Sequence, residues 1–209
     1  MALYPEAPLF TLAREKGLDQ TQRFAGRKIH TSFIERLPFG RTKFRFYLPF
    51  MPLAIEQFEL DGYDIVFSSN HAIGKGVLTR ADQLHISYIH TPIRYAWDLG
   101  GQYLREAHLS WGLRSMFIRA VMHYIRLWDV LAANRVDIFL ANSHCVRRRI
   151  WKCYRRPAEV IYPPVQVDRF QWQQAREDYY LAVSRFVPYK RMGLIVDAFG
   201  ELGLPIKVI

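Results

Sequence analysis

The sequence has few of the residues and segments that mark secreted or membrane-spanning proteins. Its 209 residues include two cysteines, Cys145 and Cys153. On one predicted helix they lie about 12 Å apart along the axis, too far for a disulfide, which favours a reduced, cytoplasmic protein. No run approaches the roughly 18 apolar residues of a membrane span. The first ten residues lack the basic start and apolar core of a signal peptide.

Signatures of several function classes do not occur either. There is no internal repeat, no low-complexity tract and no zinc-like spacing of cysteine and histidine. The pattern GxxxxGK[ST] is missing, so the chain is not a P-loop protein. No helix-turn-helix, zinc-finger or RNA-recognition signature is evident, which argues against the common nucleic-acid-binding modules.

What the chain does have is positive charge and hydrophobic residues. Its net charge is +10 and its isoelectric point about 9.8, while half of its residues are hydrophobic and 15% aromatic. This composition predicts a packed core. The excess of cations indicates an anionic partner, and nucleic acid, an anionic membrane surface and phosphorylated substrates all stay open.

One basic segment, Thr31–Phe50, interleaves arginine and lysine with phenylalanine and tyrosine. Such a segment can stack on single-stranded nucleic acid or lie at a membrane interface. The interpretation favoured here is a third one, an amphipathic segment with its aromatic side chains packed inward.

Apolar periodicity predicts an α/β fold. Four buried strands are expected to share one largely parallel sheet, and they are 63–69, 84–90, 136–142 and 159–162. The clearest helix is 113–134, whose apolar stripe is interpreted as core packing; the stripe comprises Leu113, Met116, Phe117, Ala120, Val121, Tyr124, Trp128 and Leu131. A second helix, 144–156, is capped by Ser143 and stopped by Pro157. It carries six cations, which favours an anionic surface nearby, and Arg147, Arg148, Arg155 and Arg156 are expected to contact an anionic membrane.

The C-terminal part, 179–209, reads as one strand–helix–strand unit with strands at 179–183 and 205–209. Ser184 and Arg185 follow the first strand, and Lys190 lies at the mouth of the helix. Ligands of parallel sheets bind beyond the carboxyl ends of the strands. A guanidinium, an ammonium and a helix N-terminus that converge there suit a diphosphate; two solvated cations are the alternative interpretation.

Two further clusters follow the strands of the larger part. The first is NHAIGKG after strand 63–69, where His71 and Lys75 are candidates for binding an anion close to the glycine backbone. The second is HTPIRYAWD after strand 84–90. Its candidate site residues are His90, Arg94, Tyr95, Trp97 and Asp98.

Five stretches together resemble the retaining glycosyltransferases of family 4. They read SSNHAIGKGV, YIHTPIRYAWDL, ANSHCVRRRIW, VIYPPVQVDRF and LAVSRFVPYKRM, and they begin at residues 68, 88, 141, 160 and 181. Their order is that of the family, and the subgroup that they resemble contains mannosyltransferases of bacterial surface-polysaccharide assembly. The resemblance implies a GT-B fold, in which two Rossmann-like domains hold the donor between them.

The resemblance also implies a reaction. A hexose, mannose in the first instance, would pass from GDP-mannose to a lipid-linked oligosaccharide or polysaccharide with retention of configuration. Arg185 and Lys190, with Ser184, would hold the donor diphosphate, and His90 would position a substrate. His71, Lys75 and the cluster around Arg94 would lie on the acceptor side. No cofactor or metal is implied, and the absence of an Asp-x-Asp pair fits a metal-independent reaction. The expected location is the cytoplasm, peripheral to the inner face of the plasma membrane.

The resemblance further predicts the domain organisation. An acceptor-side Rossmann-like domain is expected over 1–165 without its first strand, followed by a linker, 166–178. The nucleotide-sugar domain is expected to begin at 179 and to stop after its first βαβ unit, so the chain is expected to be truncated at both ends. A non-catalytic fragment and a basic nucleic-acid-binding module are therefore the alternative functions.

Overall fold

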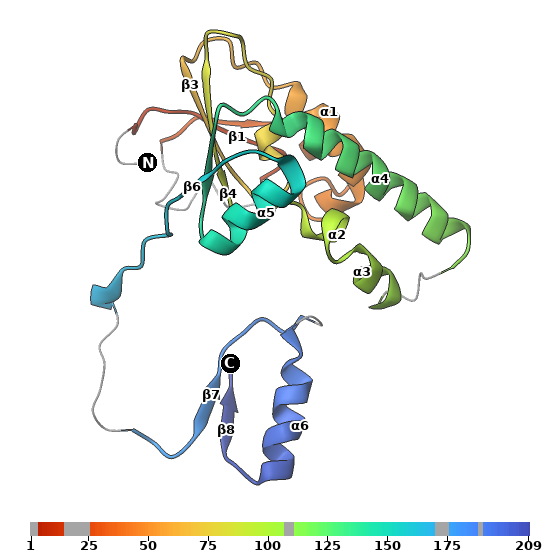
Figure 1. Cartoon of the computed structure of the whole chain (residues 1–209), viewed down its shortest axis with the longest axis vertical. Helices are drawn as coiled ribbons and strands as arrows, with labels where there is room; N and C mark the ends of the chain where they lie inside the picture. Colours follow the sequence, from red (N-terminus) through yellow and green to blue (C-terminus); the bar gives the residue numbers. More distant parts are fainter. Residues whose placement is uncertain (1–3, 15–25, 107–110, 170–175, 188–189) are drawn as a thin grey trace. The chain divides into compact units, whose positions relative to one another are not determined.

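The chain forms two compact units, Met1–Pro163 and Pro164–Ile209. The computed structural model describes residues 4–14, 26–106, 111–169, 176–187 and 190–209 (Figure 1). The stretch assigned to a linker on sequence, 166–178, groups with the second unit, and within it Val167–Arg169 forms the 3-10 helix η5.

The first unit is built on a four-stranded parallel sheet of order β3-β4-β5-β6. The strands are β3 (Ile65–Asn70), β4 (Leu84–Ile89), β5 (Ile138–Ala141) and β6 (Glu159–Val160). The prediction that four strands share one parallel sheet is confirmed. With helices between its strands, this mixed α/β arrangement is consistent with a Rossmann-like domain.

Strand alternation divides the side chains of this sheet between a covered and an open face. On β4, His85, Ser87 and Ile89 are buried. On the opposite face of β3, Ile65 and Phe67 are 52% and 60% exposed. The expectation that these strands are buried throughout is therefore correct for one face only.

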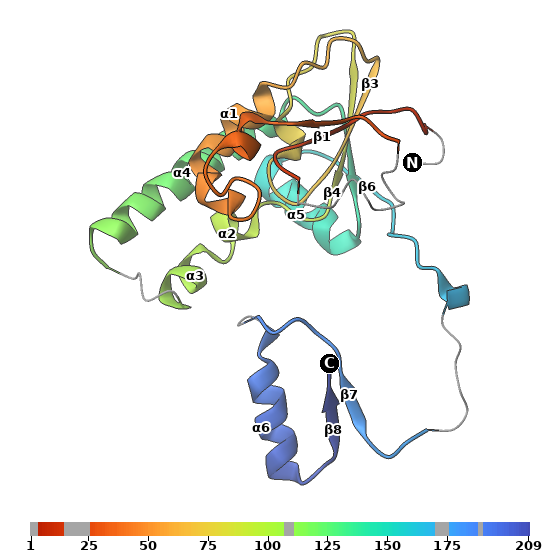
Figure 2. The same ribbon diagram turned by 180° about the vertical axis from the view of Figure 1, so that it is seen from behind.

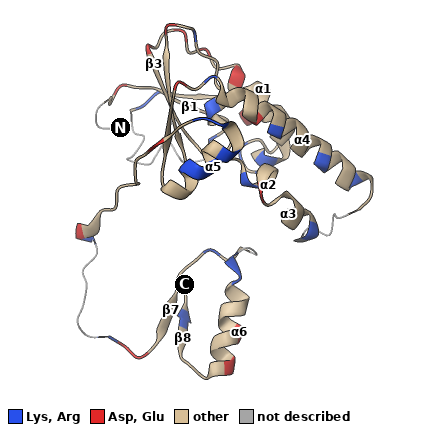
Figure 3. Ribbon diagram, in the orientation of Figure 1, with Lys and Arg blue, Asp and Glu red and all other residues tan. Residues whose placement is uncertain are grey.

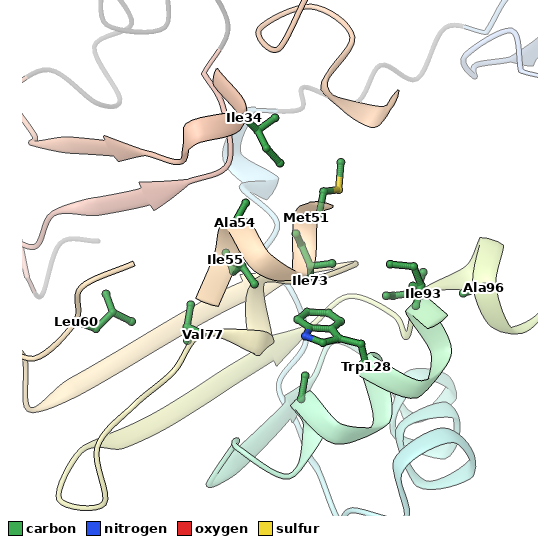
Figure 4. Packing of buried hydrophobic residues seen from close by; sticks show 12 residues of the cluster. Ile34, Met51, Ala54, Ile55, Leu60, Ile73, Val77, Ile93, Ala96 and Trp128 are labelled. Atoms are coloured by element: carbon green, nitrogen blue, oxygen red, sulfur yellow. The ribbon is translucent and has the colours of Figure 1, made fainter. Parts of the chain in front are cut away.

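The helices lie on the side of the covered face (Figure 2). They are α1 (Met51–Glu56), α2 (Arg94–Trp97), α3 (Gly100–Glu106), α4 (Leu113–Ala133) and α5 (His144–Tyr154), with α3 packed on α2. Ile55, Ile73 and Trp128 belong to the larger hydrophobic cluster (Figure 4). A second cluster lies under α5 and includes Phe139 and Ile150. Within the described part of the chain, no helix is both long and apolar enough to cross a membrane.

Helix α5 begins as predicted and ends differently. The Ser143 hydroxyl accepts a hydrogen bond from the backbone N–H of Val146 at 3.2 Å, which caps the helix. The helix ends at Tyr154 because Arg155 takes the left-handed conformation (φ 56°). The helix therefore ends before Pro157, which was expected to stop it.

Helix α4 begins where predicted and ends one residue earlier, and its predicted core stripe is only partly buried. Leu113, Phe117 and Leu131 of the expected core stripe are 84%, 65% and 62% exposed. Trp128 of the same stripe is buried as predicted, Val121 packs against the core, and the buried arc also contains Ile125 and Ala132. Both arcs of α4 are apolar, so periodicity alone did not distinguish the inside from the outside.

The first 50 residues contain elements that the sequence did not indicate. β1 (Leu9–Thr11) and β2 (Ile29–Thr31) pair in parallel, and the 3-10 helices η2 (Phe33–Arg36) and η3 (Phe44–Phe50) follow. Phe39 and Phe46 are 70% and 77% exposed, so the prediction that the aromatic residues of this segment pack inward is wrong at these positions.

The second unit is the strand–helix–strand motif predicted for it. β7 (Tyr180–Ala182) and β8 (Ile206–Val208) pair in parallel, and α6 (Met192–Leu202) connects them. The helix packs on the strands through Phe199, whose ring centroid lies 4.9 Å from that of Tyr180.

Candidate functional site

Polar side chains gather where β3, β4 and β5 end. The Ser69 hydroxyl lies 3.1 Å from Nε2 of His90, and the backbone N–H of His90 donates to the Asn70 carbonyl at 2.9 Å. Directly after β5, the Asn142 amide donates to the His90 carbonyl at 3.2 Å. Ser69 and His90 are exposed. His90 therefore lies at an accessible polar edge, where parallel sheets bind ligands.

A second imidazole and a guanidinium contribute to the same edge. Burial lowers the pKa of His71, and the nearby His90 and Arg45 lower it further. Arg45 comes from η3, far from both histidines in sequence, and was not predicted as a site residue. A neutral imidazole beside a cation can accept a hydrogen bond from a substrate hydroxyl while the guanidinium attracts an anion.

The loop after β4 forms α2, whose residues are held by the interior. Burial raises the pKa of Tyr95 to about 12, and Asp129 contributes to the rise. The Trp97 indole donates to Oδ2 of Asp129 at 2.8 Å. Asp98 forms an ion pair with Arg149 of α5, while Arg94 is exposed.

Three of these predicted residues, Tyr95, Trp97 and Asp98, line one cavity of about 480 Å³. Helices α3 and α4 complete its wall with Gly100, Gly101, Leu104, Ile118, Arg119, Met122 and Arg126, and Ala96 belongs to it as well. Arg126 also donates to the Ala96 carbonyl at 2.9 Å, which joins α4 to α2. The cavity thus combines apolar walls with a carboxylate and two guanidinium groups, the usual make-up of a small-ligand pocket.

Lys75 does not belong to an anion-binding surface as the sequence suggested. It lies in the 3-10 helix η4 (Gly74–Gly76), is 1% exposed and forms an ion pair with Asp129, which is fully buried. Burial lowers the pKa of Lys75, and Asp129 opposes that change. Gly76 is needed because a Cβ at this position would clash with the Trp128 ring, so the glycine allows close packing rather than an approach to phosphate.

Asp129 is the centre of a buried network that the sequence analysis missed. Besides the ion pair with Lys75, it accepts hydrogen bonds at 2.8 Å from the Trp97 indole and from the Tyr154 hydroxyl. Burial, followed by the charge of Asp129, raises the pKa of Tyr154 well above its ordinary value. The network ties η4, α2, α4 and α5 together and thereby fixes the loop that follows β4.

A second missed network lies inside the sheet. His85 is fully buried, with Nε2 2.9 Å from the Ser68 hydroxyl and Nδ1 3.3 Å from the Arg135 carbonyl. Ser68 in turn bonds Ser87 at 2.9 Å. Burial lowers the pKa of His85, and the hydrogen bond to the Arg135 carbonyl opposes that change, as expected for an imidazole removed from water.

In the second unit, Ser184 and Lys190 line a cavity of about 550 Å³ beside the start of α6. The backbone N–H of Ser184 donates to the Ile209 carbonyl, and that of Lys190 to the Val187 carbonyl, both at 2.9 Å. Arg185 follows Ser184 and is exposed, but it does not line this cavity. Helix α6 has no side-chain cap at its N-terminus.

No group of three or more metal-ligating side chains occurs among the residues that the structure places. A comparison with protein families finds the model of Glycosyltransferase Family 4, matched over residues 8–169. The chain belongs to this family. No curated protein matches the chain at a significant level.

The family match covers the polar edge, the cavity beside α2 and both buried networks. It ends before β7, so Ser184, Arg185 and Lys190 lie outside the matched residues. Family membership supports glycosyl transfer as the general activity. The site thus consists of an accessible histidine pair at the sheet edge and an adjoining loop whose aromatic residues are fixed from behind by Asp129.

Proposed function

We propose that this family 4 chain transfers a hexose, mannose in our assignment, from a sugar nucleotide to a lipid-linked oligosaccharide or polysaccharide, with retention at the anomeric carbon. The observation that carries the proposal is the family match over 8–169, on a unit whose strand ends present exposed His90. The proposed fold is GT-B, with the first unit on the acceptor side and the second on the donor side.

The donor side of the proposal uses the second unit. Ser184 and Lys190 share a cavity next to the N-terminus of α6, where helix N–H groups and an ammonium favour a diphosphate. Arg185, exposed beside them, can add a bidentate guanidinium. As the sugar leaves, negative charge grows on the diphosphate and these groups stabilise it, which is the role of a metal ion in other transferases. The donor proposed is GDP-mannose.

The acceptor side uses the strand ends of the first unit. His90 is assigned to positioning the acceptor hydroxyl, with His71 and Arg45 beside it. The leaving phosphate can accept the proton of that hydroxyl, so the reaction needs no base from the protein. A lipid-linked acceptor places the chain at the cytoplasmic face of a membrane, with an anionic bilayer as its partner.

The test is transfer of labelled sugar. The protein is incubated in EDTA with GDP-mannose labelled in the sugar and with a lipid-linked glycan extract, and the lipid product is digested with α- and β-mannosidases. A product cleaved by α-mannosidase supports a retaining, metal-independent mannosyl transfer from this α-linked donor. A β-linked product contradicts retention, and a product formed only with another sugar nucleotide contradicts the choice of mannose.

The alternative of nucleic-acid binding has one observation in its favour. Phe39 and Phe46 are exposed, and the Lys43 ammonium lies 5.6 Å from the Phe39 ring centroid, as on surfaces that stack bases. A gel-shift titration with single-stranded oligonucleotides at several salt concentrations distinguishes the two functions. The proposal expects no complex at 150 mM salt, whereas a salt-sensitive complex would favour the alternative.

A further inference from the structure

Helix α4 has an apolar face that the described chain leaves uncovered. Leu113, Phe117 and Leu131 are 84%, 65% and 62% exposed, and Met116, Tyr124 and Leu127 on the same arc are 67%, 45% and 54% exposed. The opposite arc is packed, with Ile125 and Ala132 fully buried. The helix is therefore anchored on one side and presents large apolar side chains to the outside on the other.

The exposed residues form one continuous stripe. Positions 113, 117, 120, 124, 127 and 131 alternate spacings of four and three residues, which keeps them on a single side of the helix. At 1.5 Å per residue the stripe is about 27 Å long. A contiguous apolar surface of this length is uncommon on an isolated domain and marks an interaction surface.

The charges around the stripe are positive. Arg114 and Arg119 are exposed along α4, and its one acidic residue, Asp129, is buried. Figure 3 shows arginines at intervals along the helix. Trp111, 94% exposed, precedes the first turn, and tryptophan is the side chain most favoured at the level of lipid headgroups.

We propose that α4 lies in the plane of an anionic bilayer, with the stripe in the acyl boundary and the flanking cations at lipid phosphates. The proposal rests on the membrane partner of the proposed function and assigns its surface. A second copy of the chain would fit the spacing of the stripe but would bring like charges together on both flanks. A bilayer with anionic lipids satisfies the apolar face and the cations at once.

This surface differs from the one expected on α5. Two cations of the segment 144–156, one on α5 and one just beyond its end, are already engaged within the first unit. Arg149 is paired with Asp98, and Arg156 donates to the Val136 carbonyl at 2.7 Å. Arg147 and Arg148 remain exposed, and Trp151 of the same helix is 54% exposed. Helix α5 therefore offers cations with a single large apolar side chain, whereas α4 offers a continuous apolar stripe.

The experiment is co-sedimentation of the full chain with vesicles of phosphatidylcholine alone or with 30% phosphatidylglycerol. The double variant F117Q/L127Q should bind the anionic vesicles at least about tenfold more weakly than the wild type, because two large apolar side chains no longer enter the bilayer. The control variant F39Q/F46Q removes two exposed aromatic residues elsewhere and should bind like the wild type. Circular dichroism and the urea midpoint establish that each variant is folded.

A second measurement needs no change to the stripe. Trp111 fluorescence should shift to the blue with anionic vesicles and be quenched by brominated acyl chains, and W111F should lose most of that change. Equal binding of F117Q/L127Q and wild type, or a larger loss in F39Q/F46Q, overturns the proposal. So does a lipid-independent dimer that F117Q/L127Q dissociates. None of these readouts requires sugar transfer, so an inactive protein that binds vesicles refutes the proposed function alone.

Discussion

The buried ion pair between Lys75 and Asp129 gives the sharpest prediction about stability. Both side chains are inaccessible, at 1% and 0% exposure, so neither charge can recover hydration when its partner is removed. Breaking a buried pair on one side costs about 3–5 kcal/mol. Lys75→Met leaves Asp129 with the hydrogen bonds from Trp97 and Tyr154, so its cost should lie near the lower value. Asp129→Asn preserves shape but turns an amide N–H₂ or a neutral oxygen toward the ammonium, so its cost should lie near the upper value.

The double variant Lys75→Met/Asp129→Asn removes both charges and leaves one amide group without a partner, at a cost of about 1–3 kcal/mol. The double-mutant cycle should therefore give a coupling of about 5–7 kcal/mol, above the roughly 0.5–3 kcal/mol that is usual for residues in contact. The assay is urea unfolding followed by tryptophan fluorescence, since four of the five tryptophans lie in the first unit. Additive single effects, or an Asp129→Asn variant that is milder than Lys75→Met, would refute the assignment of Asp129 as the centre of the network.

Three further predictions concern pH, helix capping and the donor site. The pKa of His85 is lowered in the fold, so His85 takes up a proton more readily in the unfolded chain than in the folded one. The free energy of unfolding should therefore fall as the pH drops below about 6.5, by at most about 1.4 kcal/mol per pH unit. His85→Gln should flatten this slope in urea titrations, and an unchanged slope would contradict a neutral His85. Ser143→Ala should lower the unfolding free energy by about 1 kcal/mol and Ser143→Asp should restore it, whereas equal stability of the two variants would argue against the cap. In the transfer assay, Arg185→Ala or Lys190→Ala should each reduce kcat about 10²–10³-fold. Arg185→Lys should recover only part of the lost kcat, because an ammonium cannot form the bidentate contact of a guanidinium. Near-normal turnover of the alanine variants would contradict a role for these residues in donor binding.

The sequence predicted the strands and the long helices because their signals are local. Each strand of the main sheet is a short run of β-branched and aromatic residues, and α4 and α5 have clear apolar periodicity. β1 and β2 were missed because each is three residues long, too short for a period of two to stand out. Their pairing joins residues about 20 positions apart, and local patterns do not report such pairing.

The orientation of α4 shows a different limit. Carboxylates are almost never fully buried unless they are paired, so the arc that contains Asp129 is an unusual interior surface. It became the interior because Lys75, 54 residues earlier in the chain, neutralises that carboxylate. The same pairing explains why the glycine-flanked lysine resembled an anion site. Asp129 and Lys75 are each neutralised by a residue far away in sequence, so the residues that surround each of them in the sequence did not indicate that it is buried.

The polar edge, in contrast, follows from strand direction, and strand alternation then divides it into two functions. In the run Ser68–Asn70, the middle residue points to the open face of the sheet and reaches His90. Its two neighbours point to the covered face, where Ser68 bonds His85 and Ser87. Three consecutive polar residues thus serve an accessible site and an interior network in turn. A substitution at Ser69 should therefore affect substrate contacts, whereas one at Ser68 should affect stability, although the two residues are adjacent and chemically identical.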